Sequence, residues 1–432
     1  MQAMDREGDT QLKQPRIFYG WVVLAGLFIM YAASNGIGVN TMPLFNPQMA
    51  ATFGLDIAGI SKLVGYFWIL LALPLPFIGQ LLDRVSARLL LTTGAIALAG
   101  CMLLLGQIRS YGMLVAFYIL YPVFLSFCGM LSGLYILNQW FSRYRGIAIG
   151  IYLMASSIGG AVFPRLAGQW IQAFGWQQAA FYVGIAGAVC MLLPLLVIRN
   201  KPADKFTWPD GIAGTVASVV LKNKGASGKA LKIALKSPGL YLLVITTALL
   251  WFVIIGFQSN QGFLLKDLRL NAAQSGTVIS LFFICSVAGK LLFGWLCDIF
   301  NKKVLMVLSI AVLTLGCLLL WQSLVNQSLL QLAVVVLGIG FAGTFTMIQL
   351  FVAFLYIGPA YGGVLGIVTF ADTLASAMGA VVVANLRKSG GGFELPFKLL
   401  IILSSIALVT TLFIKKSSPA SALSPESTAT NL

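Results

Sequence analysis

The sequence predicts an all-α membrane protein in which twelve transmembrane helices form two pseudo-symmetric six-helix bundles. Hydrophobic residues make up 59% of the 432 residues and charged residues only 9%, a balance far outside that of soluble domains. We count about twelve apolar segments of roughly 20 residues, the length needed to cross a bilayer core of roughly 30 Å. One short phrase also occurs twice, about half a chain apart, which indicates a duplicated architecture.

The apolar segments divide the chain into two halves of six. They are centred near residues 30, 71, 97, 125, 158, 187, 252, 286, 313, 341, 374 and 405. The first segment is too long and too closely followed by others to be a cleaved signal peptide. The predicted parts are a cytoplasmic tail (1–17), a first bundle (18–198), a basic linker (199–237), a second bundle (238–415) and a disordered Ser/Pro/Thr-rich tail (416–432).

The repeated phrase stands at the end of the second and the eighth apolar segment. It reads GQLLDRVSAR from Gly79 and GWLCDIFNKK from Gly294. In both copies Gly-x-Leu-x-Asp is followed by basic residues, and the copies are about 215 residues apart. A carboxylate at a helix end can accept hydrogen bonds from the N-terminus of a neighbouring helix, and the glycine allows the helices to approach closely. Asp83 and Asp298 are therefore predicted to help close one face of the protein.

The basic residues indicate the orientation in the membrane. The net charge is +16, but the basic residues lie in alternate loops, which argues against a nucleic-acid partner. Two of the 28 basic residues lie inside apolar segments (Arg165 and Lys290), and 19 fall on the side of the termini and the linker. By the positive-inside rule, both termini are predicted to be cytoplasmic. Seven remain on the outer side: Lys62, Arg109, Lys266, Arg269, Arg387, Lys388 and Lys398.

Several classes of function are excluded or disfavoured by residue types. The chain has no His and six Cys, none in a CxxC pair, so the cysteines are predicted to be packing residues. Without clustered nucleophiles or metal ligands we expect no enzyme, no metal and no cofactor. A channel is disfavoured because no ring of pore charges or carbonyl filter is visible.

Two further segments, one at the start of the first helix and one between the fourth and fifth helices, carry recognisable motifs. FYGWVV opens the first helix at Phe18, and NQWFSRYRGIAIGIYLMASSIGGAVFP joins the fourth and fifth helices from Asn138 to Pro164. The chain as a whole resembles the major facilitator superfamily, and these two segments are similar to the monocarboxylate transporters and the related oxalate:formate antiporters. The resemblance implies alternating access and a gating latch that favours the outward-facing state, formed by Gly79, Asp83, Arg84, Arg88, Gly294, Asp298 and Lys302.

Three charged residues lie where lipid tolerates charge only at a cost: Arg165, Lys290 and Asp372. Lys290 occupies the place at which the resembling families carry an arginine that holds the substrate carboxylate, and lysine offers the charge without the bidentate fork. Asp372 is predicted to couple transport to a proton. Both lie roughly 14–15 Å from the cytoplasmic ends of their helices, so we expect them to pair when the carrier is empty. A structural lysine and a static ion pair are the alternatives.

Differences from the resembling families limit the range of candidate substrates. The helix-1 lysine of the monocarboxylate transporters would fall near Val39, and their helix-8 aspartate near Ser286, so their proton route is not reproduced. The second basic residue of the oxalate antiporters is also missing, and one cation with one acid favours a monoanion. The residues predicted to bind substrate are Lys290, Tyr31, Asn35, Tyr135, Gln258, Asn260, Gln349 and Arg165.

The sequence therefore predicts a secondary active transporter that moves a small organic anion, a monocarboxylate, by alternating access with proton symport. We expect a monomer in the bacterial inner membrane, with the anion, protons and the bilayer as its partners. An anion exchanger without proton coupling is the first alternative. A non-transporting ligand sensor on the same fold is the second, and both intact latch phrases and the short tails disfavour it.

Overall fold

The computed structural model describes residues 18–82, 85–212, 233–356 and 361–414. Within these ranges the chain forms helices and connecting loops and contains no strand. Eleven of the helical stretches are long and apolar enough to cross a membrane, and a shorter apolar helix covers Ile57–Ala72. The predicted all-helical membrane fold is confirmed.

The N-terminal half and the start of the linker contain the following helices and turns. These are α1 (Tyr19–Asn35), the π-helical η1 (Gly36–Thr41), α2 (Met42–Thr52), α3 (Ile57–Ala72), α4 (Leu75–Leu82), α5 (Ala87–Leu105), α6 (Tyr111–Cys128), α7 (Met130–Trp140), α8 (Arg145–Phe174), α9 (Trp176–Leu192) and three short 3₁₀ turns, η2 (Leu193–Leu196), η3 (Pro202–Lys205) and η4 (Pro209–Gly211).

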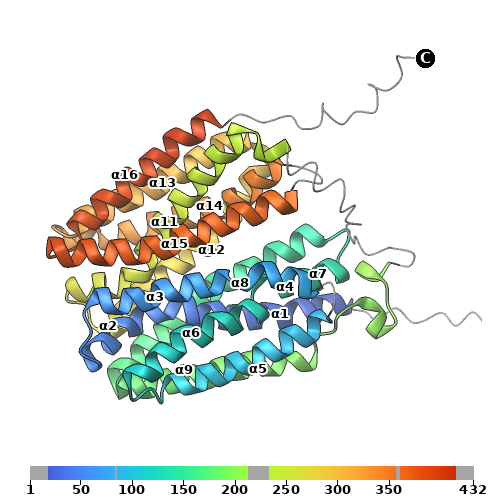
Figure 1. Cartoon of the computed structure of the whole chain (residues 1–432), viewed down its shortest axis with the longest axis horizontal. Coiled ribbons are helices and arrows are strands. Elements are labelled where there is room, and N and C mark those ends of the chain that lie inside the picture. The colour runs from blue at the N-terminus through green and yellow to red at the C-terminus, as the bar shows by residue number, and fades with distance from the viewer. Residues whose placement is uncertain (1–17, 83–84, 213–232, 357–360, 415–432) are drawn as a thin grey trace, which may run out of the picture.

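The C-terminal half repeats the pattern with longer uninterrupted helices. These are α11 (Pro238–Asp267), α12 (Ala272–Ile299), α13 (Lys302–Ser323), the 3₁₀ turn η5 (Gln327–Leu329), α14 (Leu330–Leu355), α15 (Tyr361–Gly390) and α16 (Glu394–Phe413). Figure 1 shows the two halves lying one above the other, with the helix axes of both running across the picture.

The helix breaks follow from local sequence. The second predicted span is divided into α3 and α4 between Ala72 and Leu75, where Pro74 cannot donate the backbone hydrogen bond that a continuous helix needs. The fourth span divides into α6 and α7 at Gly129, whose backbone is extended. Polar side chains start several helices, as when Asp56 accepts a hydrogen bond from the Gly59 amide at 2.7 Å.

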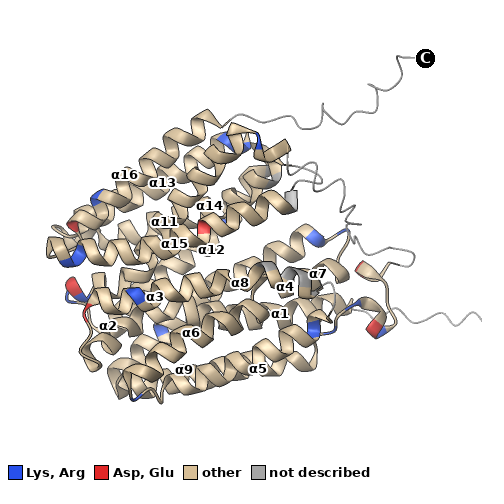
Figure 2. Ribbon diagram, in the orientation of Figure 1, with Lys and Arg blue, Asp and Glu red and all other residues tan. Residues whose placement is uncertain are grey.

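The halves meet along three pairs of helices, α8 with α12, α3 with α15 and α2 with α11. At one end of these pairs the Lys388 ammonium, on α15, donates to the Asp56 carboxylate at the start of α3 at 2.6 Å. We call this the closed end, and we call the opposite end, where α9 stops and α11 begins, the linker end. Figure 2 shows most charged residues at the two ends of the helices and in the loops, with red also visible in the interior of the C-terminal half.

Candidate functional site

The main contact between the halves is made by α8 and α12, which run antiparallel. Near the closed end, a Cβ added to Gly168 would lie 2.4 Å from the backbone oxygen of Ala272. Nearer the middle, the hydroxyls of Ser157 and Ser286 are 3.1 Å apart and form a buried hydrogen bond. These small residues let the two backbones approach closely. The contact continues toward the linker end as far as Lys290.

Lys290 is buried at this interface and bonds only neutral groups. Its side chain crosses from α12 to α8, where Nζ donates to the Leu153 backbone oxygen at 3.2 Å and to Ser156 Oγ at 3.3 Å. The ammonium also lies 4.7 Å from the centre of the Phe345 ring. Buried charges are normally paired with an opposite charge, so an ammonium held by neutral oxygens and a ring retains the capacity to bind an anion.

Asp372 is a buried acid within the C-terminal half, opposite in charge to Lys290. It lies on α15, is 5% exposed, and its Oδ1 has no hydrogen-bond partner in the part of the chain that the structure describes. The side chain of Thr247, on α11, lies beside the carboxyl group. A buried carboxyl oxygen without a donor is costly, which marks this position as one where a proton or another ligand can be accommodated.

Lys290 and Asp372 do not form the expected ion pair. Among the described residues three ion pairs occur, all toward the closed end: Asp56–Lys388, Asp267–Arg387 and Glu394–Lys398. Equal depth fixes a residue's position along the membrane normal but not its direction around the helix axis. Lys290 turns toward α8 of the opposite half, whereas Asp372 faces α11 of its own half.

Packed side chains nevertheless connect the two charges. Phe345, under the Lys290 ammonium, makes an edge contact with Trp251 at a centroid distance of 5.8 Å. Trp251 lies four residues, about one turn, after Thr247 on α11. Phe345, Trp251 and one turn of α11 therefore lie between the anion-binding candidate and the proton-binding candidate within the C-terminal half.

A polar network on the N-terminal half meets the same interface. Asn40, 4% exposed, lies in the π-helical turn η1. Its amide nitrogen donates to the Ser156 backbone oxygen at 2.8 Å, and its amide oxygen accepts a hydrogen bond from Gln258 Nε2, on α11, at 2.7 Å. Single π-turns inside α-helices frequently occur at functional sites. The network joins both halves next to Lys290.

Close packing of glycines brings Asn40 to α8. A Cβ on Gly36 would lie 2.7 Å from the Gly159 Cα, and one on Gly159 would lie 2.0 Å from the Ala32 backbone oxygen. Only residues without a side chain allow the two backbones this distance. Asn40 was absent from the predicted site because asparagine and serine occur widely in membrane helices, and the π-turn that directs Asn40 toward α8 leaves no clear sequence pattern.

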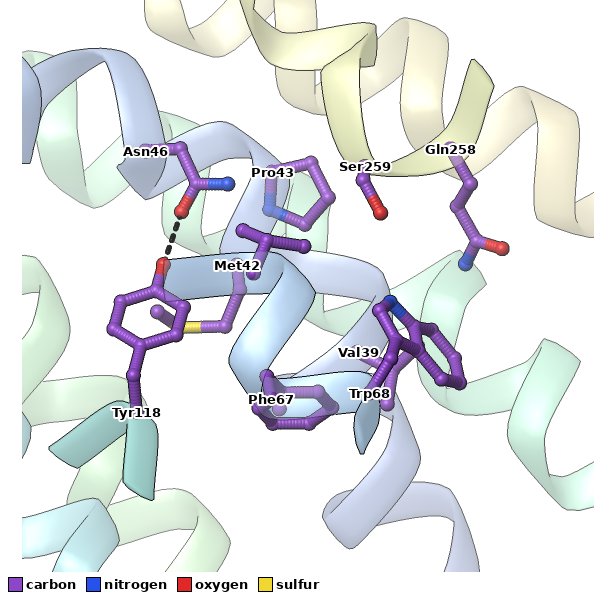
Figure 3. Close-up of a pocket in the computed structure, with 11 residues that line it drawn as sticks. Val39, Met42, Pro43, Asn46, Phe67, Trp68, Tyr118, Gln258 and Ser259 are labelled. Carbon is purple, nitrogen blue, oxygen red and sulfur yellow. Dashed lines mark hydrogen bonds between the residues drawn. The ribbon is translucent and has the colours of Figure 1, made fainter. Parts of the chain in front are cut away.

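A narrow pocket lies beside the network, toward the closed end. Its walls come from η1, α2, α3 and α6 of the N-terminal half and from α11 of the other half. Figure 3 shows Gln258 and Ser259 facing this space from α11, opposite Trp68 on α3. Across the pocket, Tyr118 donates a hydrogen bond to Asn46 at 2.6 Å. The lining is otherwise apolar, so the pocket adds few polar groups to the Lys290 region.

Comparison with known proteins identifies the family. A model of the Major Facilitator Superfamily matches residues 23–263 and 257–431. This chain belongs to that superfamily. The superfamily membership confirms a multi-pass membrane transporter and not an enzyme. No curated protein sequence matches this chain.

Solved structures of superfamily transporters share the fold. Two are crystal structures of a bacterial homolog to the human lysosomal transporter Spinster. The inward-facing, unoccupied structure is 16% identical, has a TM-score of 0.67 and aligns over 92% of this chain and 95% of that chain. The inward-facing, occupied structure is 17% identical, has a TM-score of 0.70 and aligns over 94% and 100%. At these identities the likeness concerns the fold alone.

The other residues predicted to bind substrate are dispersed around the superfamily fold. Tyr31 is buried and stacks on Tyr152 at a centroid distance of 4.7 Å. Asn260 is buried and donates to the backbone oxygens of Gly256 and Ala380 at 3.0 Å, within the C-terminal half, and its amide oxygen accepts a hydrogen bond from Ser61, on α3 of the other half, at 3.4 Å. Gln258 alone joins the network beside Lys290. The half-buried members of the predicted set are Asn35, Tyr135 and Gln349.

Arg165 lies apart from the Lys290 region. It is an exposed residue of α8, nine positions beyond Ser156 and so roughly 14 Å further toward the closed end. The structure brings Lys290, Gln258, Asn40 and Ser156 together, and leaves Arg165 outside this group.

The gating phrases stand at the linker end, as the superfamily fold requires. Gly79 lies on α4 and Gly294 on α12, while Asp83 and Arg84 fall outside the described residues. Among the described residues, no atom lies within 4 Å of a Cβ built on Gly294. Of the remaining predicted latch residues, Arg88 is half-buried, Lys302 lies 5.2 Å from the Phe354 ring centre, and Asp298 is the penultimate residue of α12.

The start of the linker is attached to the N-terminal half by a buried acid, Asp210, that no sequence pattern singles out. Asp210, 8% exposed, accepts hydrogen bonds from the backbone amides of Ser142 at 2.9 Å and Arg143 at 2.6 Å, just before α8. The Tyr144 amide is 3.5 Å from its other oxygen. Nearby, the Trp140 indole donates to the Arg199 backbone oxygen at 3.0 Å. Asp210 thus serves α8 as a cap from the linker.

Proposed function

We propose that this superfamily transporter moves a small monocarboxylate together with a proton by alternating access. The observation that carries the proposal is Lys290, a buried ammonium between the two halves that pairs with no carboxylate among the described residues. A substrate carboxylate entering the interface gives this cation the charged partner that it lacks. Charge-assisted hydrogen bonds of this kind are roughly twice as strong as neutral ones.

The neutral partners of Lys290 explain why the site is ready for an anion. The Leu153 carbonyl and the Ser156 hydroxyl hold the ammonium in place without cancelling its charge. When a carboxylate arrives, it replaces one of these weak acceptors. The other remains to orient the ammonium, so binding requires little reorganisation of the side chain.

Proton coupling follows from the net charge of the loaded carrier. An anion at Lys290 and a proton on Asp372 together leave no net charge in the membrane interior, whereas either ligand alone leaves one. Because uncompensated charge in a low-dielectric interior is costly, the doubly loaded and the empty carrier should cross between conformations more easily than the half-loaded one. This coupling needs proximity through Phe345 and Trp251, and not an ion pair.

The number of buried basic side chains at the interface sets the charge of the proposed substrate. Lys290 is the one buried basic residue at the described interface between the halves. A single ammonium binds a carboxylate without the two-point geometry of a guanidinium. We therefore propose a monoanion, with looser selection of carboxylate orientation than an arginine site would give.

Orientation and gating complete the proposal. Both termini and the linker face the cytoplasm of a bacterial cell, by the positive-inside bias of the loops, and the protein works as a monomer. The closed end is then the outer face. The gating phrases at Gly79 and Gly294 would close the linker end when the outer face opens.

An anion exchanger without proton coupling is the second candidate. The absence of contact between Lys290 and Asp372 favours it, since the charge of Asp372 then need not respond to substrate at all. In that case Asp372 would be a structural residue, and internal anion would replace the proton as the driving partner.

Uptake into proteoliposomes distinguishes these candidates. The panel contains labelled lactate, pyruvate, formate, acetate and oxalate, with one sugar and one cationic drug as controls, and each is tested with and without an inside-alkaline pH gradient. Proton symport predicts accumulation of a monocarboxylate only with the gradient. Uptake that ignores the gradient but requires internal anion would support exchange. Uptake of the sugar or the drug in place of every carboxylate would contradict both.

A further inference from the structure

Ser156 accepts one hydrogen bond from each half of the protein, from Lys290 and from Asn40. The Ser156 hydroxyl accepts from Lys290 Nζ, while its backbone oxygen accepts from the Asn40 amide nitrogen. The hydroxyl also donates to the Leu153 backbone oxygen at 3.2 Å, the other acceptor of Lys290. The same turn of α8 therefore holds the ammonium on one side and Asn40 on the other.

The chemistry of these groups fixes the orientation of both amides. A backbone oxygen can only accept, so Asn40 must turn its NH₂ group toward Ser156. Its oxygen is then left for Gln258, which must present its own NH₂ group. All of this takes place in a region where Asn40 is 4% and Gln258 5% exposed, so breaking either bond leaves a buried polar group without a partner.

Asn40 thereby forms hydrogen bonds with two helices, and the two bonds have different roles. Its nitrogen binds α8 within its own half, at the turn that holds Lys290. Its oxygen binds α11 of the opposite half. The first bond shapes the anion site, and the second holds the halves together near the closed end.

We propose that Asn40 is a positioning residue for the anion site and a clasp between the two halves. Through Ser156 it holds the acceptors that orient the Lys290 ammonium, and through Gln258 it ties this arrangement to the closed conformation. The anion site is then fully assembled only while the closed end is shut. The proposal rests on Lys290 as the anion anchor for its first part, while the clasp is independent of the substrate.

Two substitutions separate the two bonds. Asn40→Asp keeps an oxygen that accepts from Gln258 but, once ionised, loses the donor to Ser156 and places a carboxylate beside the turn that holds Lys290. Gln258→Leu removes the bond between the halves and leaves the donor to Ser156. Ser157→Ala is the matched control, because it removes a neighbouring buried hydrogen bond between the halves, to Ser286, that does not involve Lys290.

Two readouts are measured for each variant. The first is KM and kcat for the carboxylate transported by the wild type. The second is alkylation at residue 44 in a Leu44→Cys background, quantified by mass spectrometry of the labelled peptide. Leu44 is 4% exposed and follows Pro43, whose backbone oxygen would lie 1.7 Å from a Cβ on Gly262. Gly262→Ala therefore forces α2 and α11 apart and gives the open reference for labelling.

Asn40→Asp should raise KM by at least the roughly two- to tenfold range of one lost hydrogen bond, because its carboxylate also competes with the substrate for Lys290, with little change in kcat and with near-wild-type labelling. Gln258→Leu should raise labelling toward the Gly262→Ala level by a similar factor. Ser157→Ala should leave KM unchanged. If Asn40→Asp and Gln258→Leu behave alike, or if neither differs from Ser157→Ala, the proposal is wrong. If the wild type transports no carboxylate, the proposed substrate fails, and the labelling still tests the clasp.

Discussion

Asp210 and Asp372 are both buried aspartates, yet their surroundings are opposite. Asp210, at the start of the linker, receives backbone N–H groups on both carboxylate oxygens. Asp372, in the interior of the C-terminal half, has one oxygen with no donor among the described residues. Burial is similar, at 8% and 5% exposed, so the difference lies in the hydrogen bonds that each site supplies.

The difference separates a structural carboxylate from one available to a ligand. A satisfied buried carboxylate stabilises the fold around it, and an unsatisfied one costs stability unless something binds there. Lys290 belongs with Asp372, because its partners are neutral. By contrast, the three ion pairs among the described residues involve charges that are partly exposed, where pairing is worth little.

The largest expected effect comes from removing the unpaired cation. Lys290→Gln should weaken carboxylate binding roughly 10- to 100-fold, the worth of a charged hydrogen bond, as measured by the concentration dependence of uptake. Lys290→Arg should retain uptake and discriminate more sharply between carboxylates. Lys398→Gln, which removes an exposed partner of Glu394, is the control. Undiminished uptake by Lys290→Gln would remove the anion site from Lys290.

Stability measurements test the comparison of the two aspartates directly. Asp210→Asn should lower the free energy of unfolding by about 1–3 kcal/mol, because it weakens the cap on buried amides. Asp372→Asn should leave stability unchanged or raise it, because it removes an uncompensated buried charge. Thermal unfolding in detergent measures both. Asp204→Asn is the linker control, since exposed Asp204 bonds only the nearby amides of Asn200 and Lys201. Equal losses for Asp210→Asn and Asp372→Asn would contradict the distinction.

The smallest effect is expected at the closed end. Hydrogen bonds from the Lys388 ammonium and then from the Gly59 amide lower the pKa of Asp56 below its ordinary value of 3.8. Its contribution to the closed conformation is thus fully present above that value and is lost only as pH falls through the lowered pKa. Because the reacting thiolate fraction itself rises with pH, alkylation at residue 44 is compared with the Gly262→Ala reference at each pH, and this ratio should not vary between pH 5 and 8 on account of this pair.

Lys388→Gln provides the matched measurement at the closed end. Because the Asp56–Lys388 pair is about half exposed, the Lys388→Gln substitution should raise alkylation at residue 44 by less than about fivefold. A pH-dependent change between 5 and 8 that disappears in Lys388→Gln would show that Asp56 senses pH in the physiological range, against this prediction.

The fold could be predicted well because lipid imposes one strong requirement. Each span must be long and apolar, and the repeated Gly-x-Leu-x-Asp phrase reveals the duplication. Lys290 and Asp372 could be singled out by the same rule, since lipid does not tolerate unexplained charge. Whether Lys290 and Asp372 pair could not be predicted. A residue's depth in the membrane follows from counting along its helix, but the direction in which its side chain points depends on packing. Asn40 and Ser156 were missed because close Gly36–Gly159 packing and a π-turn bring them together.

The central claim is that Asp372 stays unsatisfied in order to accept a proton. The most direct test measures monocarboxylate uptake and monocarboxylate exchange side by side in proteoliposomes containing wild type or Asp372→Asn. The account predicts that Asp372→Asn loses accumulation driven by an inside-alkaline gradient and keeps exchange against internal substrate. Gradient-driven accumulation at the wild-type level in Asp372→Asn would contradict it.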